Sequence, residues 1–193
     1  MRVTRRIFSA SVSFIIMQEN TFMSDVKIRV LTPQDWPLYK SVRLKSLKDS
    51  PDSFGSTYDQ EITFSDAEWQ ARLDLGFRNL DALPLMAELA GEAVGLAWGV
   101  IHEPGSKTAH IYQMWVSPSQ RGGGIATSLL SEITNWAFNK GCERIELAVT
   151  TSNEAAVSLY TSSGYLPTGS LEELRIGSAL LVQPMVKQLG NTK

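Results

Sequence analysis

Three consecutive glycines, Gly122 to Gly124, are the residues whose type and spacing carry the clearest chemistry. They follow an apolar stretch that ends at Val116, and apolar residues at helical spacing come after them, so a helix is expected to begin at about Gly124. The first turn of a helix has N–H groups without internal partners, and the helix dipole adds partial positive charge there. Glycine lets a bulky phosphate approach the main chain, and Arg121 adds a cation at the rim. The segment therefore predicts a binding site for a phosphorylated ligand.

The residues after the glycines narrow the class of ligand. A P-loop needs Lys followed by Ser or Thr after its last glycine, but Ile125 and Ala126 stand here. A dinucleotide fingerprint needs a third glycine where this chain has Thr127. What remains, Arg121-x-x-Gly124-x-Ala126, resembles the acetyl-CoA pyrophosphate loop, Gln/Arg-x-x-Gly-x-Gly/Ala, of the GCN5-related N-acetyltransferases (GNAT). The alternative is a glycine-rich turn that only caps an ordinary helix.

A second stretch, residues 153–165, resembles another signature of the same family. Asn153 opens the expected helix, Leu159 and Tyr160 lie within it, and Gly164 and Tyr165 end it. One expected helix and one expected strand separate the two motifs, as they do in the family. Because both signatures occur in the right order, the chain is identified, by this resemblance, as a member of the family.

The resemblance implies how acetyl-CoA is held. Main-chain N–H groups of the glycine loop bind the diphosphate, and the backbone of Met114 and Val116 hydrogen-bonds the pantetheine arm. Asn153 contacts the same arm, although a helix N-cap explains this residue equally well. The residues expected to bind the cosubstrate are Met114, Val116, Arg121, Gly122, Gly123, Gly124, Ile125, Ala126, Thr127, Asn153 and Tyr160.

Acetyl transfer to an amine needs a proton for the departing thiolate and a neutral amine. Tyr160, which the resemblance places beside the sulfur, is the candidate acid, because a neutral phenol can protonate a thiolate; the alternative is an aromatic ring that packs a helix on the sheet. His110 is the candidate base, at a position where related enzymes often have Glu. A structural histidine, or deprotonation by solvent, is the alternative. Tyr112 and Gln113 are further candidates for orienting substrate or water.

The composition is that of an ordinary globular enzyme. The 193 residues are 43% hydrophobic and 20% charged, with a formal net charge of −2, which argues against nucleic acid as a partner. Cys142 is the single cysteine, so no internal disulfide and no cysteine metal cluster is expected, and two histidines are too few for a histidine-rich metal site. We expect no metal cofactor and a cytoplasmic location.

Residues 1–23 form the one unusual segment. Arginines at the start and an apolar run up to Met17 superficially resemble a signal peptide, but serines dilute the run and it is too short to span a membrane. We interpret residues 1–23 as a dispensable extension, with a targeting role as the alternative, and residues 24–193 as a single domain. No membrane association is expected.

The remaining pattern predicts an α/β (α+β) domain. Strands are expected over residues 26–30, 84–90, 93–102, 109–116, 144–149 and 180–186. Helices are expected over residues 33–48 and 124–140, and two more are expected to begin at about residues 66 and 153. Gly91 is expected at the first central position of a tight hairpin turn. The sum is a mixed, mostly antiparallel sheet of about six to seven strands flanked by helices on both faces. The family fold implies that strands 109–116 and 144–149 are adjacent and splay apart to leave a cleft.

The predicted function is direct acetyl transfer from acetyl-CoA to a primary amine, with the length of the acyl group left open. The acceptor is expected between the first two helices and the sheet. A small molecule is favoured; a protein amine (a ribosomal-protein N-terminus or a lysine) and a non-catalytic acyl-CoA sensor are the alternatives, and a homodimer is possible. The polar and aromatic candidates for the acceptor pocket are Arg43, Asp49, Phe54, Ser56, Tyr58 and Glu61.

Overall fold

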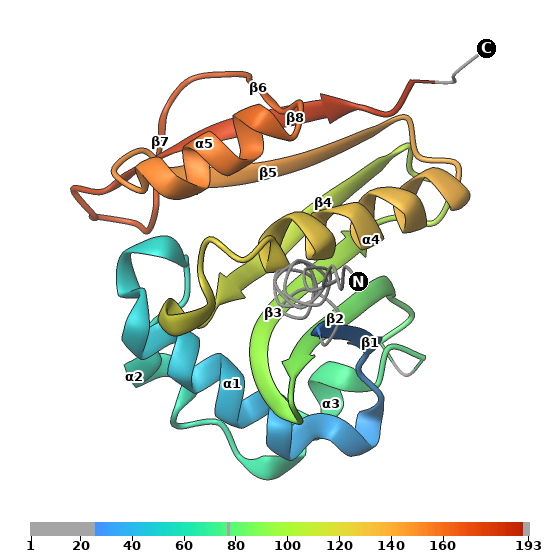
Figure 1. Ribbon diagram of the computed structural model, residues 1–193, viewed down its shortest axis with the longest axis vertical. Helices are drawn as coiled ribbons and strands as arrows, with labels where there is room; N and C mark the ends of the chain where they lie inside the picture. The colour runs from blue at the N-terminus through green and yellow to red at the C-terminus, as the bar shows by residue number, and fades with distance from the viewer. Residues whose placement is uncertain (1–25, 77, 191–193) are drawn as a thin grey trace, which may run out of the picture.

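The computed structural model describes residues 26–76 and 78–190 (Figure 1). The helices are α1 (Trp36–Asp49), α2 (Tyr58–Glu61), α3 (Asp66–Leu73), α4 (Ile125–Asn139) and α5 (Glu154–Ser162). The strands are β1 (Val26–Val30), β2 (Asp81–Leu89), β3 (Glu92–Ile101), β4 (Thr108–Val116), β5 (Arg144–Thr150), β6 (Leu166–Pro167), β7 (Glu172–Glu173) and β8 (Leu181–Gln188). The predicted extension, residues 1–23, lies outside the described residues. Within them, no helix has the length and apolar character needed to cross a membrane.

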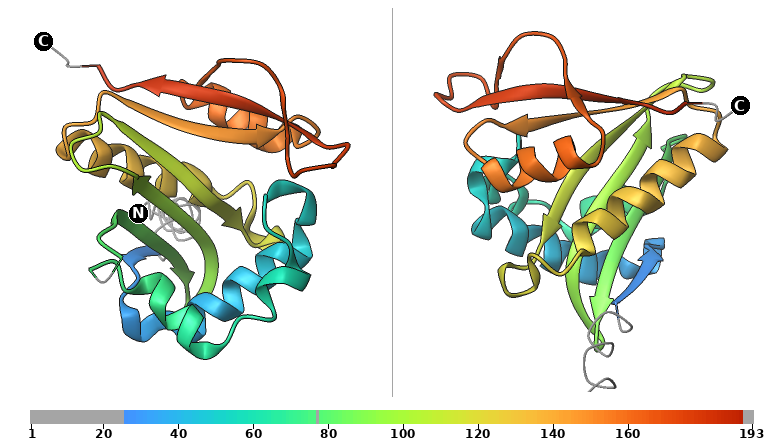
Figure 2. Two further views of the ribbon diagram at one scale, coloured as in Figure 1. Left: turned by 180° about the vertical axis from the view of Figure 1, so that it is seen from behind. Right: turned by 45° about the horizontal axis from the view of Figure 1, so that its top comes forward.

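The strands form one mixed sheet in the order β1-β2-β3-β4-β5-β8-β6, and β7 also pairs with β8. Among the described strand pairs, only β4 and β5 run parallel. Helices α4 and α5 cover one face of the sheet, and α1 and α3 lie against the other (Figure 2). The predicted mixed, mostly antiparallel sheet with helices on both faces is confirmed. The expected strand number fell short of eight because β6 and β7 are two residues long and offer no alternation to detect.

Side-chain caps fix where the first helices begin. Ser65 and Glu68 form the predicted capping box at α3, and Thr32 forms another with Asp35. The predicted helix over 33–48 opens with a 3-10 turn over Pro33–Asp35 before α1. Helix α2 was not predicted; it is a single turn that a third capping box, at Thr57, starts.

The turn between β2 and β3 corrects one prediction. Leu89 pairs with Glu92, so the loop has only two residues, Ala90 and Gly91. Both have positive φ, 50° and 83°, which is the signature of a type I′ turn. Gly91 therefore occupies the second central position, not the first, because Ala90 adopts the left-handed conformation itself.

Strand β4 contains a bulge at Gln113. Leu96 lies opposite Trp115 and Trp98 opposite Tyr112, so two residues of β4 face one residue of β3. Gln113 has a φ of 55°, and its side-chain oxygen accepts a hydrogen bond of 3.1 Å from the Tyr39 hydroxyl on α1.

The bulge changes which face each later residue of β4 presents. Ile111 and Val116, five positions apart, both belong to the core beneath α4 and α5. Trp115 belongs to the opposite core, with residues of α1 and α3. A strand without the bulge would place Ile111 and Trp115 on the same face, because side chains alternate along a regular strand.

Strands β4 and β5 part after a short parallel stretch. Their pairing begins at Thr108 with Arg144 and ends at His110 with Glu146. Beyond these residues the two strands diverge, as Figure 1 shows between the yellow-green β4 and the orange β5. The predicted splay is confirmed, and the bulge lies at the point where it opens.

Close packing of α4 on the sheet yields a stability prediction. A Cβ added to Gly99 of β3 would lie 2.9 Å from the Trp136 ring and 3.0 Å from the Ile133 side chain. Replacing Gly99 with Ala is expected to lower the free energy of unfolding by about 1–3 kcal/mol, measured by urea denaturation. A second change, Trp136→Leu, should recover part of that loss. A Gly99→Ala variant as stable as the wild type would contradict the packing.

Candidate functional site

A cavity of about 520 Å³ occupies the gap on the side of α4 and α5. Its walls come from the end of β4, the glycine loop, the start of α4, the end of β5 and α5. The predicted cosubstrate residues that line it are Met114, Val116, Arg121, Gly122, Gly124, Ile125, Ala126, Thr127, Asn153 and Tyr160. Gly123 lies between lining residues of the same loop. The structure therefore brings together residues from two motifs that are about 30 positions apart in sequence.

The glycine loop presents unused hydrogen-bond donors. Gly122 and Gly124 have φ values of 81° and 80°, a conformation that favours glycine. Among the described residues, no hydrogen bond uses the N–H of Gly122, Gly123 or Gly124. The next three residues, 125–127, form the first turn of α4, where N–H groups have no internal acceptor. The loop is thus a cradle of donors at the positive end of a helix dipole.

Val116 directs its backbone toward the cavity. The N–H of the next residue, Ser117, donates to the Val94 carbonyl at 2.8 Å, while Val116 lies opposite Gly95. Hydrogen-bonded and non-bonded pairs alternate in an antiparallel ladder, so Val116 points its own N–H and C=O away from β3. Met114 lies within the bulge, whose extra residue breaks one-to-one pairing with β3. The Val116 N–H is therefore available to a pantetheine amide, whereas the Val116 carbonyl accepts from Arg121 Nε at 3.1 Å.

Arg121 anchors the loop to α1. Its Nε donates to the Val116 carbonyl at 3.1 Å, and its Nη2 forms an ion pair with Asp49. Asp49 also accepts from the Trp115 indole N–H at 2.9 Å. Burial alone would raise the pKa of Asp49, but the hydrogen bonds from Trp115 and Ser50 and the charge of Arg121 lower it. In this arrangement the Arg121 guanidinium fixes the loop at the cavity rim; its predicted contact with a phosphate stays a prediction.

Asn153 acts as the N-cap of α5. Its Oδ1 accepts from the Ala156 N–H at 3.1 Å, and its Nδ2 donates to the Ser53 hydroxyl at 3.2 Å. The second bond ties α5 to the loop after α1, across the cavity. The N-cap reading is therefore observed, and the same side chain also lines the cavity.

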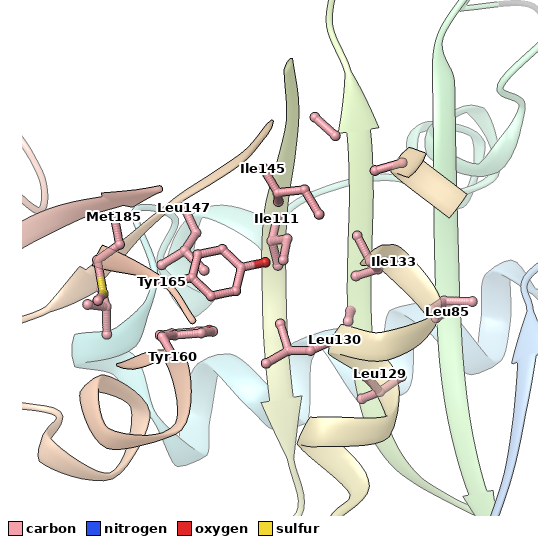
Figure 3. Close-up of a cluster of buried hydrophobic side chains, with 14 of the residues drawn as sticks. Leu85, Ile111, Leu129, Leu130, Ile133, Ile145, Leu147, Tyr160, Tyr165 and Met185 are labelled. Carbon is pink, nitrogen blue, oxygen red and sulfur yellow. The ribbon is translucent and has the colours of Figure 1, made fainter. Parts of the chain in front are cut away.

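Tyr160 lies at the inner end of the cavity. Its ring is buried and meets the Tyr165 ring edge-on, with centroids 5.8 Å apart. Figure 3 shows both rings beside Leu147 and Met185, with the Tyr165 hydroxyl pointing toward Ile111 of β4. Burial raises the pKa of the Tyr160 phenol above its ordinary value, so it carries its proton at neutral pH. The Tyr165 hydroxyl is buried without a hydrogen-bond partner among the described residues.

A second cavity, of about 590 Å³, opens from the first. The two share Ser53, Met114, Ala148 and Tyr160, so they meet in the gap between β4 and β5. Arg43, Phe54 and Ser56, three of the predicted acceptor residues, line it together with residues of β8 and the segment before it. Asp49, Tyr58 and Glu61 do not line it: Asp49 holds Arg121, Tyr58 packs under the Lys48 ammonium, and Glu61 pairs with Arg43.

The positive charge at the second cavity is already neutralised. Arg43 is buried and donates from Nη2 to Glu61 at 2.9 Å, and Arg72 reaches the same carboxylate at 3.0 Å. Burial would raise the pKa of Glu61, but these two cations lower it, so the group stays ionised. Removing Glu61 would leave an unpaired buried cation, which is costly.

The other charged residues that line the second cavity are carboxylates. They are Glu146, Glu172 and Glu173. Glu146 pairs with Arg144 at 2.8 Å, and Glu173 accepts from the Gly177 N–H at 2.8 Å. The wall is therefore acidic and suits a cationic ligand. Sequence reasoning missed Glu172 and Glu173 because β7 is too short to place them.

His110 is half-buried on β4 and lines the second cavity with Tyr112 and Gln113. Burial, and then the nearby His102 imidazole, lower the pKa of His110, so its ring is neutral at pH 7. The position agrees with a role near the acceptor. His102, which contacts both His110 and Tyr112, gave no signal in sequence because it lies outside every motif.

Comparison with known proteins gives one family match. A family model described as "Acetyltransferase (GNAT) family" matches residues 44–165, which is more than half of the chain. The match spans the glycine loop, the Asn153 cap and Tyr160.

Two curated relatives share the central part of the chain. A mycothiol acetyltransferase of Salinispora tropica is 34% identical over 102 residues, which are 51% of this chain and 33% of the relative. An L-2,4-diaminobutyric acid acetyltransferase of Nocardia farcinica is 26% identical over 85 residues, 44% of each chain. The chain thus spans less than half the length of either relative.

The fold recurs in solved structures. A spermidine N-acetyltransferase from Vibrio cholerae, crystallised with CoA and spermine, superposes with a TM-score of 0.69. It is 20% identical, and the superposition covers 86% of this chain and 96% of that one. At this identity the likeness concerns the fold.

Proposed function

The chain belongs to the GNAT family of acetyltransferases, and on that premise we propose that it transfers acetyl from acetyl-CoA to a primary amine of a small molecule. The observation that carries the proposal is the pair of joined cavities. One presents the free donors of the glycine loop, the other has an acidic wall, and Tyr160 stands where they meet.

The first cavity fits the cosubstrate. The N–H groups of residues 122–127 offer hydrogen bonds to a diphosphate, and the Val116 N–H offers one to an amide of the arm. Acetyl-CoA supplies the activated acetyl group. Its binding along β4 would direct the thioester toward the gap, within the region that Tyr160 lines.

The transfer requires two proton movements and one exchange of bonds. The amine nitrogen forms a bond to the acetyl carbon, the carbon–sulfur bond breaks, and the amine loses a proton. The neutral Tyr160 phenol, held by its contact with Tyr165, donates to the departing sulfur and later regains a proton from water. No covalent acetyl-enzyme is needed, because the two joined cavities would let both substrates meet in the gap at the same time.

The acidic wall supports a small cationic acceptor. Glu172 and Glu173 would attract an amine that carries a second positive charge, while Glu146 is already paired with Arg144. Two of the similar proteins named above act, by their names, on diaminobutyric acid and spermidine, which are compounds of this class. A protein amine is the second candidate. A homodimeric state and a cytoplasmic location also stay predictions, to be checked by sedimentation and by fractionation.

Calorimetric titration of the full chain with acetyl-CoA and with ATP tests the cosubstrate. We expect acetyl-CoA to bind and ATP to bind weakly or not at all; a preference for ATP would contradict the proposal. A panel of diamines, polyamines and amino acids with thiol detection then tests turnover. Binding of acetyl-CoA with a silent panel would favour a protein acceptor or a sensor.

A further inference from the structure

Three ring side chains form a continuous chain on one face of the sheet. His102 follows β3, and His110 and Tyr112 lie on β4. The His102 Nε2 lies 2.9 Å from the Tyr112 hydroxyl, within hydrogen-bond distance. The His102 and His110 ring centroids are 4.8 Å apart, and the His110 and Tyr112 rings are stacked at 6.2 Å.

The three rings connect the second cavity with solvent. His110 and Tyr112 line that cavity. His102 is not among its lining residues and is exposed at the end of β3. The hydrogen bond between Tyr112, which is itself 44% exposed, and the exposed His102 therefore leads from the acceptor cavity to bulk water.

We propose that Tyr112 and His102 form the outlet for the proton that the acceptor amine loses, a role that rests on the function proposed above. The amine proton passes to the Tyr112 oxygen while the phenolic proton of Tyr112 passes to His102 Nε2. His102 becomes an imidazolium and releases its other ring proton to water. A tautomeric shift of the His102 ring and rotation of the Tyr112 hydroxyl then restore the starting protonation state of both residues. No oxidant or further reactant is required.

The surroundings favour His102 over His110 as the proton acceptor. His110 is half-buried, and burial followed by repulsion from His102 lowers its pKa, so a charge on His110 is disfavoured. His102 is exposed, so a proton that reaches its ring can pass directly to water.

Charged groups on the neighbouring strands act on the same rings. Glu146 of β5 acts on both His110 and Tyr112, and Arg144 acts on His110. On β2, Asp81 lies opposite Ile101, the residue before His102, and pairs with Lys140 of the turn after α4 at 3.0 Å. Asp81 therefore lies on the α4 face with Ile101 and Lys140, opposite to the three rings, whereas Glu146 lies on their face and pairs with Arg144.

Two single variants and chemical rescue test the outlet. Tyr112→Phe keeps the ring and deletes the hydroxyl, and His102→Ala removes the exposed imidazole. Each variant is expected to lower kcat at least about tenfold and to leave the KM for acetyl-CoA unchanged. The loss should be smaller than a complete loss of acid–base catalysis, because water replaces part of the route. Added imidazole should restore His102→Ala but not Tyr112→Phe. Glu103→Ala, an exposed neighbour, is the matched control and should match the wild type with and without imidazole.

A further readout separates a proton route from a structural role. Because the two residues act in series, the double variant should be no slower than the slower single variant.

The outcomes distinguish the two proposals. If the wild type neither binds acetyl-CoA nor releases thiol, the proposed function fails. If the wild type is active and both variants retain full kcat, or imidazole gives no rescue, only the outlet is overturned.

Discussion

Replacing Gly124 with Glu is expected to lower the affinity for acetyl-CoA at least about 100-fold, or about 2.7 kcal/mol. Gly124 caps α4 in the left-handed conformation and lines the first cavity. A Glu side chain would occupy the cradle and bring a carboxylate to the place where a diphosphate needs positive potential. Calorimetry with acetyl-CoA measures the loss, and far-UV circular dichroism establishes that the variant is folded.

Gly105 offers a matched control for backbone strain. Its φ of 79° is close to that of Gly124, and an added Cβ would meet no atom of the described residues within 4 Å. Gly105→Glu therefore imposes a similar conformational cost far from the cavity. The Gly105→Glu variant should lose about as much free energy of unfolding as Gly124→Glu, yet bind acetyl-CoA with the affinity of the wild type. Equal loss of affinity in both variants would show that strain, not occupation of the cradle, causes the effect.

Replacing Tyr160 with Phe is expected to lower kcat about 100-fold and leave acetyl-CoA affinity nearly unchanged. The substitution keeps the ring that packs on Tyr165 and removes only the hydroxyl of a residue that lines both cavities. Thiol release at saturating acetyl-CoA and amine measures the change. An unchanged kcat would remove the acid role and leave Tyr160 as a packing residue.

Tyr165→Phe is the control for that experiment. Tyr165 forms the other half of the ring pair, but within the described part of the chain its buried hydroxyl has no hydrogen-bond partner and it lines neither cavity. Deleting an unsatisfied buried hydroxyl should not lower the free energy of unfolding and should leave kcat unchanged. A large loss of kcat in Tyr165→Phe would imply that the ring pair, rather than the Tyr160 hydroxyl, supports turnover.

Features with a local cause could be predicted from sequence. Gly124 starts α4 because only a short stretch of chain decides that turn, and Asn153 caps α5 through a bond to a residue three positions away. Capping at Ser65 was equally local. The splay of β4 from β5 came from family resemblance, not from any pattern in the strands themselves.

Features set by distant contacts could not be predicted. Gln113 is left-handed although nothing in its neighbours demands it, and its side chain is held by Tyr39, 74 positions away. Arg121 reaches Asp49, 72 positions back in the chain. The acidic wall of the second cavity depends on where β7 meets β8, which a two-residue strand does not reveal.

The extra residue at Gln113 sets the inward and outward sides of every later residue of β4. If the same chain paired one-to-one with β3 through this segment, Trp115 would be driven beneath α4, and Val116 would turn its backbone N–H toward β3. Losing the extra residue would instead keep Trp115 opposite Leu96 and remove only the bulge and the contact of Gln113 with Tyr39. Among homologous chains, loss of this one residue should therefore be compatible with the core, whereas a further inserted residue should be far rarer here than in the exposed turn around Gly105.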